Sequence, residues 1–149
     1  MKKTFKLMGL LLLSLTMTLT SCGDKGPAPA NEDNSIVLGD DLYKITSARC
    51  VADISDYEAE LIFYCNELIL TIELEGQTDA AVGAYELLHE GRYTAEIDMV
   101  GSDKDYDVTG TLAISREETD NVYSITISGE AYKDRAPRYF SMVYQGELK

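Results

Sequence analysis

From residue 93 to the C-terminus, apolar and polar residues alternate with a period of two. Tyr93–Met99, Val108–Ser115, Tyr123–Ala131 and Phe140–Leu148 each carry this alternation. Because successive side chains of a β-strand point to opposite faces, the pattern predicts four strands with one buried face each. The residues predicted to face the core are Tyr93, Ala95, Ile97, Met99, Val108, Leu112, Ile114, Tyr123, Ile125, Ile127, Phe140, Met142 and Tyr144.

The segments between these four strands are short and rich in turn formers and charged residues. They cover residues 101–105, 116–121 and 133–137. Loops of this length join antiparallel neighbours, whereas parallel strands need a crossover of roughly a dozen residues or more. The second half of the chain is therefore predicted to be an antiparallel meander.

The first half contains one strand signal and one long apolar stretch. Leu42–Val51 is rich in β-branched and aromatic residues, residues 54–58 resemble a loop, and Leu61–Leu74 is apolar in both phases. Cys65 and Leu68 can both face the core only if the alternation of inward and outward side chains shifts by one residue at residues 66–67. A bulge or a tight turn there would produce this slip. We favour this slip, which would let Cys65 approach Cys50 on a neighbouring strand.

Residues 80–90 are expected to form a short helix or an irregular loop that ends at Gly91, although Gly83 weakens a helix. Glycines inside predicted strands indicate bulges, bends or the close approach of another backbone, and Gly110, Gly129 and Gly146 are of this kind. The fold class predicted from these patterns is all-β. Residues 36–149 would form one antiparallel β-sandwich or barrel-like meander of about seven to eight strands.

Residues 1–21 have the layout of a secretory signal. Lysines come first, an apolar run covers Leu7–Leu19, and small residues precede Cys22. The apolar run is shorter than the roughly 20 residues needed to cross a bilayer. Residues 22–35 lack large apolar side chains and are predicted to be a flexible tether.

The residues LTSC, from Leu19 to Cys22, resemble the lipobox of bacterial lipoproteins. The acids near Cys22 resemble surface-export signals of Bacteroidetes lipoproteins, and the glycine-containing strands of the last third resemble small lipoproteins of that group with no assigned function. The resemblance implies that Cys22 is lipidated and becomes the first residue of the mature chain. It also implies an envelope location, anchored at the outer membrane on the periplasmic face or the cell surface. The alternative is an ordinary signal peptide with an incidental Cys22.

The acidic balance of the chain restricts its partners. The sequence has 13 basic and 26 acidic residues; residues 1–21 hold three lysines and no acid, so 10 basic and 26 acidic residues remain, a net charge of −16. Such a field repels phosphate backbones and anionic head groups. We therefore expect no nucleic-acid partner, and we expect membrane contact through the lipid anchor alone.

With Cys22 lipidated, Cys50 and Cys65 remain as a pair. Exported proteins occupy compartments where disulfides form and persist, so a Cys50–Cys65 disulfide is predicted. Two buried free thiols are the alternative.

Few residues suggest chemistry, and the sequence predicts no catalytic residue, no bound metal and no cofactor. His89, the single histidine, lies beside two glutamates and is expected to be an ordinary surface or loop residue. Asp103, Asp105 and Asp107 alternate as calcium ligands do, but Val108 and Ile114 stand where an EF-hand needs glycine and glutamate. The simpler interpretation is a solvated hairpin turn.

Tyrosine is abundant, with 10 residues, and tryptophan is absent. Tyr57, Tyr106 and Tyr132 fall in loops or on the polar phase, which makes them the first candidates for a ligand surface. The leading hypothesis is a non-enzymatic, lipid-anchored envelope protein that presents a surface to a protein or glycan partner. The alternatives are a small-ligand carrier or enzyme that uses a barrel interior or loop-lined pocket, and a structural role in envelope assembly.

Overall fold

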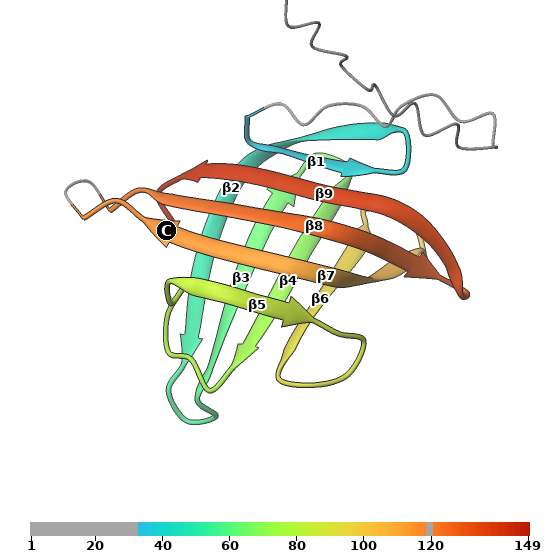
Figure 1. Cartoon of the computed structure of the whole chain (residues 1–149). Helices are drawn as coiled ribbons and strands as arrows, with labels where there is room; N and C mark the ends of the chain where they lie inside the picture. The colour runs from blue at the N-terminus through green and yellow to red at the C-terminus, as the bar shows by residue number, and fades with distance from the viewer. Residues whose placement is uncertain (1–32, 119–120) are drawn as a thin grey trace, which may run out of the picture.

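The computed structural model describes residues 33–118 and 121–149, which form nine β-strands and no helix (Figure 1). The predicted signal segment, Cys22 and most of the predicted tether lie outside the described residues. The first strand begins at Ser35, one residue before the predicted domain start. The strands are β1 (Ser35–Leu38), β2 (Asp41–Asp53), β3 (Glu58–Cys65), β4 (Leu68–Glu75), β5 (Gly83–Leu87), β6 (Tyr93–Met99), β7 (Asp105–Arg116), β8 (Tyr123–Lys133) and β9 (Ala136–Gly146).

Eight of these strands close into an antiparallel barrel. The order around it is β6-β4-β3-β2-β1-β9-β8-β7, and β7 pairs with β6 to complete the circle. The ninth strand, β5, pairs with β7 outside this circle. In Figure 1, β5, β7, β8, β9 and β1 make the front layer, and β2, β3, β4 and β6 cross behind it. The predicted all-β fold and the predicted meander of the second half are both confirmed.

Two seams of the barrel are short. Three residue pairs join β6 to β7, from Glu96↔Asp107 to Asp98↔Asp105. On the other side, β1 supplies only four residues between β2 and β9. Beyond β1, Cys50 N donates to Lys149 O at 3.1 Å and Lys149 N donates to Ala48 O at 3.2 Å, so the C-terminal residue continues the pairing with β2.

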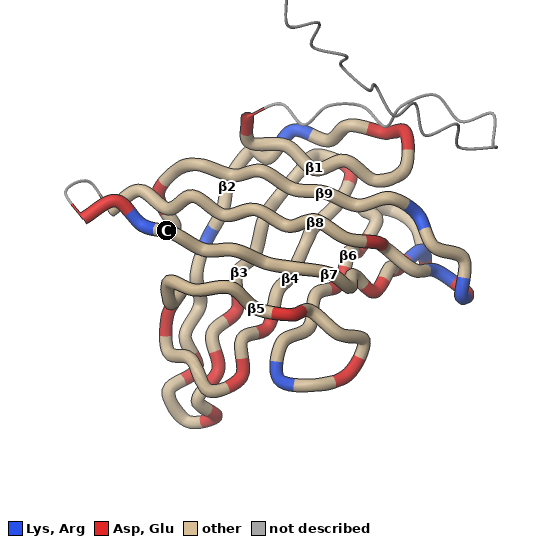
Figure 2. The backbone as a smooth tube through the Cα atoms, viewed as in Figure 1, with Lys and Arg blue, Asp and Glu red and all other residues tan. Residues whose placement is uncertain are grey.

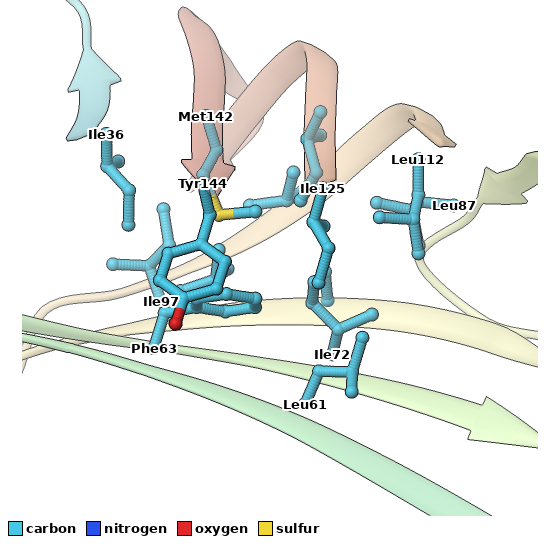
Figure 3. Close-up of a cluster of buried hydrophobic side chains, with 14 of the residues drawn as sticks. Ile36, Leu61, Phe63, Ile72, Leu87, Ile97, Leu112, Ile125, Met142 and Tyr144 are labelled. Carbon is cyan, nitrogen blue, oxygen red and sulfur yellow. The ribbon is translucent and has the colours of Figure 1, made fainter. Parts of the chain in front are cut away.

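Apolar side chains fill the barrel interior (Figure 3). Phe63 and Tyr144 meet edge to face with ring centroids 5.3 Å apart, and the Tyr144 hydroxyl donates to Glu147 O at 2.7 Å. An eight-stranded barrel is just wide enough for side chains to fill, so this interior is a packed core. Of the predicted core residues, Tyr93 and Met99 are half-buried against the core and the other eleven are buried.

The predicted slip between β3 and β4 is also confirmed. Phe63 and Cys65 at the end of β3 are buried, as are Leu68 and Leu70 at the start of β4. Residues 66–67 form the tight turn that lets both strands bury their apolar phase.

The short helix considered for residues 80–90 is wrong, because Gly83–Leu87 form β5. β5 pairs with Gly110–Ile114, the part of β7 that has left β6. Leu87 is fully buried and the half-buried Tyr85 packs against the core. Five residues of alternation are too few to separate a strand from a helix by period alone, and the free edge of β7 decides the outcome.

Gly110 and Gly129 face each other across β7 and β8. A Cβ on Gly129 would lie 1.9 Å from Thr109 O, and one on Gly110 would lie 2.3 Å from Ser128 O. Gly110 also has φ 141°, which disfavours a side chain. The expected close approach of another backbone is therefore confirmed for this pair.

The predicted Cys50–Cys65 disulfide is not formed, and both thiols are free. Cys50 stands opposite Leu61, whereas Cys65 stands opposite Ile45. Four residues along β3 separate Leu61 from Cys65, roughly 13 Å at the rise of a strand. A disulfide needs Cα atoms within about 7 Å. The slip turns Cys65 inward, but this register keeps it far from Cys50.

We expect Gly129→Ala to lower the free energy of unfolding by about 2–3 kcal/mol, because the methyl group would collide with the β7 backbone. Urea denaturation measures this loss. Gly101→Ala is the control, since Gly101 has φ 75° but no atom within 4 Å of its added Cβ. Its loss should be about 1 kcal/mol. Equal losses for the two variants would contradict the collision.

Both thiols should label without prior reduction. In a Cys22→Ser chain unfolded in urea, a maleimide should add twice in the absence of reductant. In the folded chain Cys65 should react more slowly than Cys50, because Cys65 is 8% exposed and burial raises its pKa to about 11. Mass spectrometry of the adducts gives both results. If the thiols label only after reduction, the predicted Cys50–Cys65 disulfide would be present after all.

Candidate functional site

The strongest convergence of polar side chains on the outer wall lies around His89, in the connection between β5 and β6. His89 Nδ1 is 3.3 Å from Asp107 Oδ2 on β7. The imidazole meets the Tyr132 ring of β8 edge to face, with centroids 5.1 Å apart. The Tyr132 hydroxyl donates to Glu130 and also contacts the Thr109 hydroxyl. Three elements therefore bring their polar groups to one place.

An ordinary surface position is expected for His89 from the sequence, and no local signal points to these partners. Asp107 and Tyr132 lie 18 and 43 positions further along the chain, so only the pairing of β7 with β6 and β8 brings them to His89. The side chains of His89 and Asp107 are 50% and 59% exposed. Water screens a pair this exposed, so its contribution to stability is small.

His89 and Asp107 form the common wall of two surface hollows. One, of about 230 Å³, is also lined by Thr71, Glu73, Thr94, Ala95 and Glu96. The other, of about 300 Å³, is lined by Tyr132, Asp134 and Arg135. In the first hollow, Thr94 Oγ1 donates to Glu73 at 3.0 Å. Both hollows offer several hydrogen-bonding groups to a polar ligand.

Arg135 reaches the second hollow from a two-residue hairpin turn. Asp134 and Arg135 have φ values of 51° and 66°, and Lys133 pairs with Ala136 on either side of them. Two positive φ values are typical of the type I′ turn that connects tightly paired strands. Figure 2 shows basic residues gathered near this turn, in contrast to the acidic residues along the lower parts of β3 and β4.

Among the described residues, the carboxylates that lie close enough to hold a metal include only Asp105 of the three considered from the sequence. Oxygens of Glu96, Asp98 and Asp105 lie within 4.8 Å of one another on the outer face of β6 and β7. Asp103 belongs to the preceding turn, and Asp107 contacts His89 instead. Glu96, Asp98 and Asp105 are all exposed, so water can solvate them without a bound ion.

Like charges crowd Glu96. Partial desolvation raises the pKa of its carboxyl, and Asp98, Asp105, Asp107 and Glu73 raise it further, in that order. The ionised form of Glu96 is therefore disfavoured in the folded protein. The negative charge of Glu96 therefore opposes folding.

The three tyrosines considered for a ligand surface have different positions. Tyr57 is 64% exposed in the β2–β3 turn, and Tyr132 is half-buried beside His89. Tyr106 is buried, so its assignment to a loop or the polar phase is wrong. β7 begins at Asp105, three residues before the predicted strand, and this places Tyr106 on the same inward face as Val108.

No family model matches this sequence, and neither the curated proteins nor the solved structures contain a significant match to it. In the described part of the chain, no helix has the length and apolarity needed to cross a membrane.

Glu96→Gln should raise the melting temperature at pH 7, because it removes one of the crowded charges. A carboxyl with a raised folded-state pKa binds its proton more tightly when folded, so its ionisation lowers stability as the pH rises through that pKa. The gain should therefore disappear below the pKa and shrink in high salt.

Calorimetry at several pH and NaCl values checks this, with the exposed Glu118→Gln as control. A gain that is independent of pH would contradict charge crowding as its cause.

Proposed function

We propose that this chain is a lipid-anchored cell-envelope protein and that its barrel is a non-enzymatic module that binds a partner through its outer surface. The packed interior is the observation that supports binding through the outer surface. Phe63, Phe140 and Ile36 are fully buried there, and a carrier would need the space that they occupy. The lipobox-like residues before Cys22 support the first part.

The surroundings of His89 support binding better than catalysis. Acid–base catalysts act from sites where burial and neighbouring groups tune their protonation. His89 and Asp107 are instead at least half exposed. A histidine–carboxylate pair also needs a nucleophile or a reacting proton in reach, and Asp107 and Tyr132 supply hydrogen-bonding groups rather than an activated nucleophile.

The two hollows beside His89 favour a second candidate, the binding of a small hydroxyl-rich ligand such as a sugar. Hydroxyl groups of such a ligand would donate to Glu73, Glu96 and Asp107, and Tyr132 would supply an aromatic contact. Binding here would need no interior cavity. In this candidate the partner is a glycan rather than a protein.

The wild-type chain should incorporate radiolabelled or alkynyl palmitate and sediment with membranes. Cys22→Ala should lose the label and appear in the soluble envelope fraction, because two or more acyl chains are needed for stable anchoring. Cys50→Ala is the matched control and should keep the label. An unlabelled wild-type chain would contradict the proposed anchoring.

The binding role is tested by affinity purification from native membranes, with the secreted Cys22→Ala chain as a second bait. A protein recovered with the wild type supports a protein partner. Release of the bound material by free monosaccharides supports the glycan candidate instead. Recovery of neither would contradict the binding role.

A further inference from the structure

The turn between β2 and β3 exposes two large apolar side chains that are close in sequence. Ile54 is 77% exposed and Tyr57 is 64% exposed. One apolar side chain on a protein surface is ordinary. A four-residue turn that presents an aliphatic and an aromatic side chain together has the composition of a protein-binding anchor.

Hydrogen bonds hold this turn in one conformation. Asp53 Oδ1 accepts from Ser55 N at 2.9 Å, from Ser55 Oγ at 2.6 Å and from Asp56 N at 3.3 Å. Tyr57 O accepts from Gly76 N at 2.6 Å, which ties the turn to the end of β4. A side chain presented on a fixed backbone loses less conformational entropy when it binds.

Tyr57 has φ 54°, in the left-handed region. This region is unusual for a bulky aromatic residue, whereas glycine or asparagine adopts it readily. A turn that only had to connect β2 to β3 would be better served by either of those residues. The backbone geometry therefore does not require tyrosine here, and the ring of Tyr57 is exposed to solvent.

Acidic residues flank the two apolar side chains in the sequence. Asp53, Asp56 and Glu58 lie within or beside the turn. Desolvation raises the pKa of Glu58, and Glu73, Glu60, Asp56 and Asp53 add to the effect, so the negative charges are close enough to repel one another. This collar opposes an anionic lipid surface and also opposes the same turn of a second copy. It complements a rim of lysine or arginine.

The turn lies far from the point where the described chain begins. Asn34 O accepts from Ile45 N at 2.9 Å, and Ile45 is eight residues along β2 from Asp53, roughly 26 Å at the rise of a strand. In Figure 1, β1 is at the top of the barrel and the β2–β3 turn is at the bottom. A chain tethered at its N-terminal side would present this turn away from its anchor.

We propose that the β2–β3 turn is the docking tip of this protein, and that Ile54 and Tyr57 enter an apolar pocket with a basic rim on a protein partner. This inference rests on the proposed function and names the surface and the partner chemistry for it. The tip supplies two apolar anchors, and the acidic collar orients them toward the basic rim.

The test places the photo-crosslinking residue benzoylphenylalanine at position 57 of the full chain in native membranes. The control carries it at position 100, because Val100 is 56% exposed in the β6–β7 turn, next to Glu67 in the β3–β4 turn and away from the tip. Position 57 should capture a defined protein that position 100 does not. The purified partner should bind Ile54→Ser at least about tenfold more weakly than wild type, and binding should weaken as NaCl is added.

Tyr57→Asn separates docking from folding. Asparagine accepts the left-handed backbone, so the urea midpoint should stay the same or rise while binding falls at least about tenfold. Val100→Asn should change binding less than about twofold. Equal capture at positions 57 and 100, capture of lipid or glycan at 57, or unchanged binding of both tip variants would overturn the docking tip.

The failures of the two proposals are distinguishable. If affinity purification still returns a partner while position 57 captures nothing, the docking tip is overturned and the proposed function stands. If neither method returns a partner, both are overturned.

Discussion

β7 pairs with three strands, and the closure of the barrel depends on its pairing with β6. Its first residues close the circle against β6, its later residues carry β5 on the same edge, and its other edge pairs with β8 from Asp107 to Arg116. The change of neighbour occurs near Gly110, where the β7 and β8 backbones approach too closely for a side chain on either strand. Glycines inside strands often mark such bends, and this pair lies where β7 passes from β6 to β5.

This constraint also explains where polar chemistry gathers. Because β7 leaves β6 after Asp107, the connection from β5 to β6 crosses the outer wall, and His89 comes to lie between Asp107 and Tyr132. The interior offers no comparable place, since aromatic and aliphatic side chains from every layer meet there. The fold thus separates a packed apolar centre from an outer surface on which the charged and polar groups lie.

The four strands of the second half, their inward faces and the turn at residues 66–67 could be predicted because a period of two is a local signal that burial of one face enforces. The close approach at Gly110 and Gly129 could be predicted as well, since glycine weakens a strand interior unless a bend or a neighbouring backbone requires it. The predictions that failed depend on which residues lie opposite one another in the folded chain, and a local sequence pattern does not contain that information. Cys50 and Cys65 pair with Leu61 and Ile45 through a register that composition does not encode. Likewise, β5 is a strand because an edge of β7 is available to it, and His89 acquires neighbours from two distant strands.

β5 also leaves an open edge on an otherwise closed fold. Among the described strands it pairs on one side only, and an unpaired edge is a template on which another chain can add a strand. β5 is five residues long, and the exposed Glu86 lies near its middle. A short edge that carries a charge is a poor starting point for edge-to-edge polymerisation. The strand that completes the front layer thereby also disfavours fibril growth from its own open edge.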